Sequence, residues 1–104
     1  MSGENEIEIV STLAPMHPGE VLREEFMSPM NLTAYAVAKA CRIPRNRIER
    51  IVREDLGISG DTALRLGKLF KVDPRFWINL QARYELDAAR LKAAGLDEIE
   101  PIAA

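Results

Sequence analysis

The sequence has few of the residues on which enzyme and metal sites depend. It contains one cysteine and one histidine in 104 residues. A single cysteine cannot form a disulfide within the chain, which favours the reducing cytoplasm as its compartment. His17 has no neighbouring ligand or acid–base partner in the sequence, and Cys41 falls on an apolar helical face. We therefore expect no catalysis, no metal and no other cofactor.

Long apolar runs and a strong net charge are also missing. No apolar run approaches the ~18 residues that a membrane span requires, and the N-terminus lacks the basic-then-apolar order of a secretory signal. A membrane partner is therefore not expected. The formal net charge is −2, which argues against general affinity for nucleic acids. Any nucleic-acid binding must be local, within what the length predicts to be one domain.

The positive charge is concentrated in one segment. Residues 39–53, KACRIPRNRIERIVR, hold six of the chain's 14 cations and only one of its 16 acids. At 100° per residue on a helix, Ile48 and Ile51 share one face, whereas Asn46 and Arg50 point in the opposite direction. Cations and amides suit phosphates and base edges, so the segment indicates DNA binding. The alternative is an amphipathic helix with a solvated charged face.

The spacing of apolar residues predicts five helices with short connections and no core strand. The expected helices cover about residues 17–27, 33–41, 44–53, 62–70 and 74–95. The three residues RIP, of which Pro44 also begins the third helix, join the second helix to the third, which is the arrangement of a helix-turn-helix. Residues 1–15 are expected to form a separate acidic arm, flexible or a short edge strand, before a domain over residues 16–95. Residues 96–104 form a short C-terminal tail.

Capping residues mark several of these boundaries. Thr33 and Asp73 are expected N-caps, whereas Ser59, Asp61 and Thr62 are all candidates for the fourth helix. Gly95 is expected to stop the last helix.

Four segments carry a family resemblance: MHPGEVLREEF, LTAYAVAKACRIPRNRIERIV, GISGDTALRLGKLF and DPRFWINLQARYEL. Together, over roughly residues 16–90, they resemble the HigA-type antitoxins, also called the VapI group, of the lambda-repressor-like (Xre) helix-turn-helix class. The resemblance implies an all-α, five-helix lambda-repressor-like domain with a longer C-terminal helix. It also implies the antitoxin of a bacterial type II toxin–antitoxin module. Such an antitoxin is a homodimer that represses its own operon and neutralises a HigB/RelE-like mRNA endoribonuclease toxin.

Two groups of side chains are expected at double-stranded operator DNA with palindromic half-sites. We expect base contacts from Arg45, Asn46, Glu49, Arg50 and Arg53. We expect phosphate contacts from Thr33, Lys39, Arg42 and Arg47. Arg42 departs from the family pattern, because such turns usually carry glycine at this left-handed position. A non-glycine residue there costs about 1 kcal/mol.

Protein partners are expected on two other surfaces. The last helix carries apolar residues on more than one side, which predicts Trp77 in the core and a dimer interface. The residues expected at that interface are Tyr84, Leu86 and Leu91. The acids expected to meet a basic toxin, together with the N-terminal arm, are Glu20, Glu24 and Glu25. The alternative is that these acids only keep the protein in solution.

Two other functions stay open at this point. The chain could neutralise a partner as a protein-interaction module without binding DNA, or act as a stand-alone Xre-type transcriptional regulator. Salt dependence separates DNA binding from an apolar protein contact, because only the former weakens steeply as salt rises.

Overall fold

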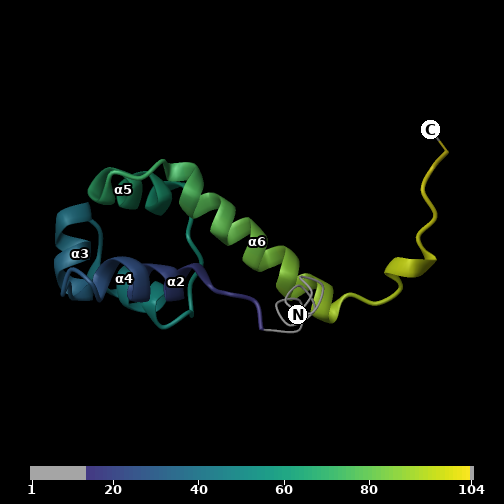
Figure 1. Cartoon of the computed structure of the whole chain (residues 1–104), viewed down its shortest axis with the longest axis horizontal. Coiled ribbons are helices and arrows are strands. Elements are labelled where there is room, and N and C mark those ends of the chain that lie inside the picture. The colour runs from purple at the N-terminus through teal and green to yellow at the C-terminus, as the bar shows by residue number, and fades with distance from the viewer. Residues whose placement is uncertain (1–13, 104) are drawn as a thin grey trace, which may run out of the picture.

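Helices make up all the regular structure in the computed structural model of the chain, which describes residues 14–103. The elements, in chain order, are α2 (Pro18–Val21), the π-helix η1 (Leu22–Met27), α3 (Ala34–Cys41), α4 (Arg45–Val52), α5 (Gly60–Phe70), α6 (Pro74–Lys92) and the 3₁₀ turn η2 (Leu96–Glu98). In Figure 1, α2 to α5 gather at one end, and α6 runs away from them toward the C-terminal tail. The predicted all-α, five-helix architecture is confirmed, because α2 and η1 form one continuous first helix.

The helices begin where their capping residues predict. The Thr33 hydroxyl accepts a hydrogen bond from the Ala36 N–H at 3.1 Å and caps α3. Of the three candidates for α5, Ser59 is the cap, and it accepts from the Thr62 N–H. Asp73 caps α6 as expected.

Two helices differ from their predicted course. The last helix ends at Lys92 rather than at Gly95, which instead adopts a left-handed φ of 76° and begins η2. Because every side chain from residue 89 to residue 103 is exposed, no packing extends the helix further. The first helix widens into a π-helix at Leu22, where Ser28 N–H donates to Arg23 C=O at 2.9 Å. Apolar periodicity did not indicate this change.

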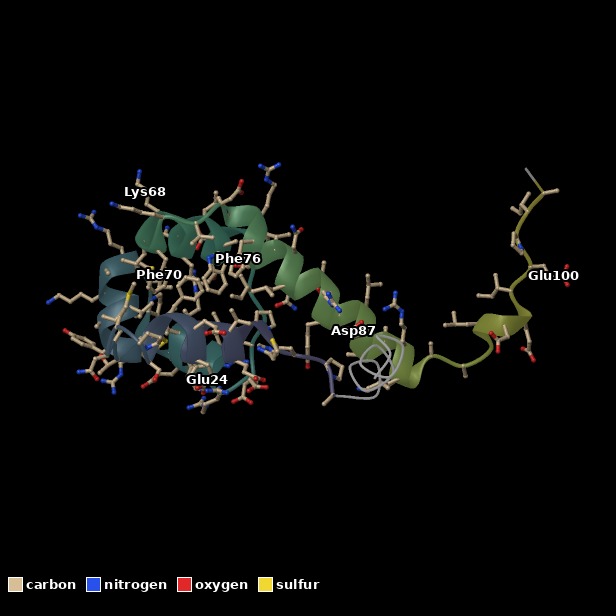
Figure 2. The ribbon with its side chains drawn as sticks, in the orientation of Figure 1. Glu24, Lys68, Phe70, Phe76, Asp87 and Glu100 are labelled. Atoms are coloured by element: carbon tan, nitrogen blue, oxygen red, sulfur yellow. The ribbon has the colours of Figure 1, made fainter. Side chains whose placement is uncertain are left out.

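One hydrophobic core joins all the helices. Its almost fully buried side chains include Leu22, Val37, Ile48, Ile51, Leu66 and Trp77. Aromatic rings fill the space between α5 and the first helix, where the ring centroids of Phe26 and Trp77 lie 5.0 Å apart. Figure 2 shows Phe70 and Phe76 beside this cluster, with Phe76 at its exposed edge. The predicted core positions of Trp77 and Cys41 are confirmed.

The first half of α6 closes the domain through polar contacts as well. Gln81 Oε1 accepts a hydrogen bond from the Ile58 N–H at 2.7 Å, which ties the loop before α5 to α6. The Tyr84 ring packs edge-on against His17, with centroids 4.8 Å apart. Beyond Tyr84, α6 projects out of the globule (Figure 1). None of the helices in residues 14–103 is long and apolar enough to cross a membrane.

Gly19 allows the first helix to approach α4 closely, so a side chain at this position should destabilise the fold. A Cβ atom at Gly19 would overlap the Ile51 carbonyl oxygen, whereas a Cβ at Gly60 would meet nothing within 4 Å. Gly19→Ala should therefore lower the free energy of unfolding by about 3 kcal/mol, because backbone cannot move aside cheaply. Gly60→Ala is the matched control and should change it by less than about 1 kcal/mol. Chemical denaturation measures both, and equal effects would contradict the close approach.

His17 makes stability depend on pH. Its Nδ1 accepts a hydrogen bond from the Gly19 N–H at 2.9 Å, and burial lowers the pKa of its ring below the ordinary 6.5, opposed in part by the charge of Glu54. Because the unfolded chain binds the proton more readily, the free energy of unfolding should fall as pH drops below 6.5. His17→Asn keeps a capping oxygen but does not titrate, so its profile should be flatter in that range. Parallel profiles from denaturant titrations of the two proteins would refute this assignment.

Candidate nucleic-acid interface

The residues Arg42–Pro44 join α3 to α4 as a three-residue turn. Arg42 has φ 58° and ψ 47°, so the left-handed backbone expected at this position is confirmed. The Ile43 N–H donates to the Ala38 carbonyl at 3.0 Å, which closes the end of α3 in a Schellman-type turn. Ala38 is buried, as expected for a small residue where two helices cross.

The short helix α4 has one buried face and one charged face. Ile48 and Ile51 are fully buried, and their burial fixes the rotation of the helix about its axis. On the outward side, Arg45, Asn46, Arg50 and Arg53 are exposed and Glu49 is partly exposed. The five residues predicted at the bases are therefore all exposed or partly exposed, four of them on α4 and Arg53 at its C-cap.

Arg45 has partners on both motif helices. Its Nε lies 2.9 Å from a carboxylate oxygen of Glu49, one turn along α4. Its guanidinium also lies 5.9 Å from the centre of the Tyr35 ring, and the Lys39 ammonium lies 5.9 Å from the same ring. Tyr35 is 53% exposed, and sequence reasoning missed it as a site residue. Tyr35 and Lys39 are four residues apart on one helix, and this spacing alone could have predicted that their side chains are neighbours.

Three other cations at this surface remain available to a ligand. Lys39, Arg42 and Arg50 are exposed and form no salt bridge within residues 14–103. Thr33 lies at the N-terminus of α3, where its hydroxyl oxygen accepts the capping bond and leaves its proton free to donate. Within the same range, no group of three or more histidine, cysteine or carboxylate side chains could hold a metal ion.

Arg47 differs from the predicted phosphate residues Lys39 and Arg42 because it forms a salt bridge within residues 14–103. It is partly exposed, and its Nη1 lies 2.7 Å from Oδ2 of Asp61 on α5. The same carboxylate pairs with Arg65 at 3.0 Å, and Arg65 donates to the Cys41 carbonyl at 2.8 Å. Hydrogen bonds from Arg47 and then Arg65 hold the pKa of Asp61 below its usual range. The sequence offered Asp61 only as a candidate cap.

The residues predicted for protein partners lie outside the α3–α4 surface. Leu86 and Leu91 are 57% and 72% exposed on the projecting part of α6, whereas Tyr84 is partly buried against His17. On the first helix, Glu20 is partly exposed, and Glu24 and Glu25 are exposed. Figure 2 shows Glu24 on the outer side of that helix, where it pairs with Arg23 at 2.9 Å. Most of the predicted acidic arm, residues 1–13, lies outside the described residues.

Comparisons with known proteins agree with this geometry. Virulence-associated protein I of Dichelobacter nodosus is 43% identical over 101 residues, which cover 97% of this chain and 88% of that protein. The structure of the antitoxin HigA of Pseudomonas aeruginosa with the higBA promoter superposes with a TM-score of 0.79 at 41% identity, covering 86% of this chain and 99% of that one. No protein-family model matches the chain.

A second similar structure is that of a HigA-family protein. An addiction module antidote protein of a HigA family from Coxiella burnetii superposes with a TM-score of 0.81 at 39% identity, covering 86% of this chain and all (100%) of that one. These similarities extend over most or all of the length of each relative. The chain therefore belongs to the HigA family of helix-turn-helix antitoxins, the group that includes virulence-associated protein I.

Proposed function

We propose that this chain is a bacterial antitoxin that represses its own operon by binding operator DNA through α4. The observation that carries the proposal is the outward face of α4, with exposed Arg45, Asn46 and Arg50 opposite the buried Ile48 and Ile51. A related HigA antitoxin of the same fold has been solved with the higBA promoter, which supports operator binding by this chain. Such a repressor acts in the bacterial cytoplasm.

Base contacts come from the outward stripe of α4. Arg50 has no salt-bridge partner within residues 14–103, so its guanidinium is free to make a bidentate contact to guanine. Asn46 precedes it by one turn and offers the amide that suits adenine. Arg45 and Glu49 pair through Nε and one carboxylate oxygen, so the two terminal nitrogens of Arg45 stay free to donate to a base while Glu49 holds the side chain. Arg53, beyond them, completes the stripe.

Phosphate contacts come from the first motif helix and the turn. Lys39 and Arg42 supply exposed cations, and Thr33 supplies a hydroxyl donor beside the amide-rich end of α3. The chain as a whole is slightly acidic, so these local cations set where DNA docks.

A two-fold dimer lets two copies of α4 contact half-sites ~34 Å apart on one face of the duplex. We place its interface on the projecting part of α6, where Leu86 and Leu91 are exposed and Tyr84 lies at the edge. This places the interface on residues 84–91 of a domain that spans residues 16–95, with an arm before it and a tail after it.

Arg50→Ala and Lys39→Ala should weaken DNA binding in two different ways. Arg50→Ala should cost about 1–3 kcal/mol on the operator and relax the preference at one base pair. Lys39→Ala should weaken binding to all duplexes similarly and flatten the salt dependence by about one unit of slope. Fluorescence anisotropy with operator and scrambled duplexes over a range of salt concentrations measures both effects.

Arg75→Ala is the charge-matched control for that pair, because Arg75 is exposed at the start of α6, outside both the helix-turn-helix and the proposed interface at residues 84–91. Its operator affinity should remain close to wild type. If Arg50→Ala weakened binding to all duplexes equally, or if Lys39→Ala weakened binding to the operator alone, the assignment of Arg50 to a base and of Lys39 to a phosphate would be wrong.

The toxin partner is proposed to be a basic, RelE-like mRNA endoribonuclease that the acidic side of the first helix contacts. Cations that bind mRNA also bind carboxylates, and opposite potentials speed association and fix its register. Glu24 and Glu25 are exposed in η1, and Glu20 lies one turn before Glu24. The N-terminal arm adds further acids in sequence.

Co-expression with the toxin tests this surface in a growth assay. Glu24→Gln with Glu25→Gln should reduce protection, because the toxin loses two carboxylate partners. The control, Glu98→Gln with Glu100→Gln, removes equal charge from the exposed C-terminal tail and should protect fully. Full protection by the η1 variant would place neutralisation on another surface.

A further inference from the structure

We propose that Asp61 of α5, through its ion pairs with Arg47 and Arg65, sets the angle between α3 and α4. We call these three residues the clamp. Arg47 serves the clamp instead of holding a phosphate. The inference deepens the proposed DNA binding and rests on it. Asp61 and Arg47 are thus positioning residues, which act on operator preference through the orientation of α4.

A chain of four contacts connects the three helices. Arg47 of α4 pairs with Asp61 at 2.7 Å, and Asp61 pairs with Arg65 of the same helix, α5, at 3.0 Å. Arg65 also contacts the other Asp61 oxygen at 3.1 Å, and its Nη1 donates to the carbonyl of Cys41, the last residue of α3, at 2.8 Å. One carboxylate therefore holds α4 directly and α3 through a single guanidinium.

The two held residues flank the turn. Cys41 directly precedes Arg42–Pro44, and Arg47 lies within the first turn of α4. The turn itself is strained, because Arg42 adopts a left-handed backbone in which a Cβ costs about 1 kcal/mol. The base-contacting residues come directly after this turn, and α4 has only eight residues, so we expect a small change at Arg42 to tilt the whole helix. Contacts on both sides of the turn oppose that tilt.

One carboxylate faces two guanidiniums at the clamp, which leaves a net charge of +1 there. Asp61 lies in the first turn of α5, where the helix dipole favours a carboxylate, and it is the acid that Arg47 and Arg65 share. Lys39, Arg42 and Arg50 have no such partner within residues 14–103 and remain available to DNA. A single exposed ion pair contributes little to the free energy of unfolding. We therefore expect the loss of the clamp to change the angle between α3 and α4 and to leave the stability of the fold nearly unchanged.

The clamp and a phosphate contact predict opposite effects for Asp61→Asn. If Arg47 bound phosphate, removing the Asp61 charge would release a cation beside the DNA and strengthen binding to every duplex. If Asp61 clamps the helices, the same change loosens α4 and weakens binding to the operator alone. Asp61 itself cannot bind phosphate, because both would be negatively charged.

The experiment uses the full chain, a duplex carrying the promoter region of its own operon, and a random-sequence duplex of equal length. Dissociation constants for both duplexes are measured over a range of salt concentrations for wild type, Arg47→Gln, Asp61→Asn and the double variant. Each single variant should lower the preference for the promoter duplex about five- to tenfold, and the double variant should lose no more than either single one. The salt slope of Arg47→Gln should equal that of wild type.

Asp73→Asn is the matched control. It also removes one exposed carboxylate paired with an arginine, but its partner Arg75 lies two residues away on the same helix, and asparagine still caps α6. Its promoter preference should remain that of wild type. Thermal unfolding checks that each variant is folded at the assay temperature.

Three results would overturn the clamp. The first is tighter binding of both duplexes by Asp61→Asn with a flatter salt slope for Arg47→Gln, which would assign Arg47 to phosphate. The second is a preference for the promoter duplex that is as large as that of wild type in both Arg47→Gln and Asp61→Asn. The third is a double variant whose loss of preference equals the sum of the two single losses in free energy. A wild-type chain without promoter preference would instead overturn the proposed DNA-binding function, and the clamp with it.

Discussion

The burial of Ile48 and Ile51 is the contact on which the DNA-facing surface depends. The helix that carries them, α4, has only eight residues, and an isolated helix of that length is not stable in water. Burying each isoleucine contributes about 1.5–3 kcal/mol, which holds the helix against α3 and the first helix. Because the two side chains fix the rotation of α4, the cations on its opposite side can face only outward.

Two backbone constraints surround this short helix. Gly19 lets the first helix approach the Ile51 carbonyl so closely that no side chain fits between them. Arg42 places a side chain where the turn favours glycine, and so adds a cation to the surface at a conformational cost. Contacts from α5 to both sides of that turn explain how the strained residue can be kept without losing the angle between α3 and α4.

The layout of the molecule separates the surfaces for its two kinds of partner. Figure 1 places α3 at one end of the molecule and the C-terminal tail at the other, with the C-terminal half of α6 between them and outside the group formed by α2 to α5. The exposed leucines of α6 therefore lie far from the helix-turn-helix. A dimer formed through them would leave both copies of α4 open to DNA. The slight excess of acid over base is compatible with DNA binding because six cations lie between residues 39 and 53.

The sequence by itself determined the features that depend on neighbours along the chain. Helix spacing, the caps Thr33 and Asp73 and the outward face of α4 follow from local periodicity and backbone preference, whereas the left-handed backbone at Arg42 was implied by the family resemblance. Other features were decided only in three dimensions. The ion pair of Arg47 with Asp61 joins residues 14 positions apart, so it depends on how α5 packs against α4. The π-helix in the first helix and the end of α6 at Lys92 likewise depend on which helical turns pack against other elements. A local sequence pattern does not predict that packing.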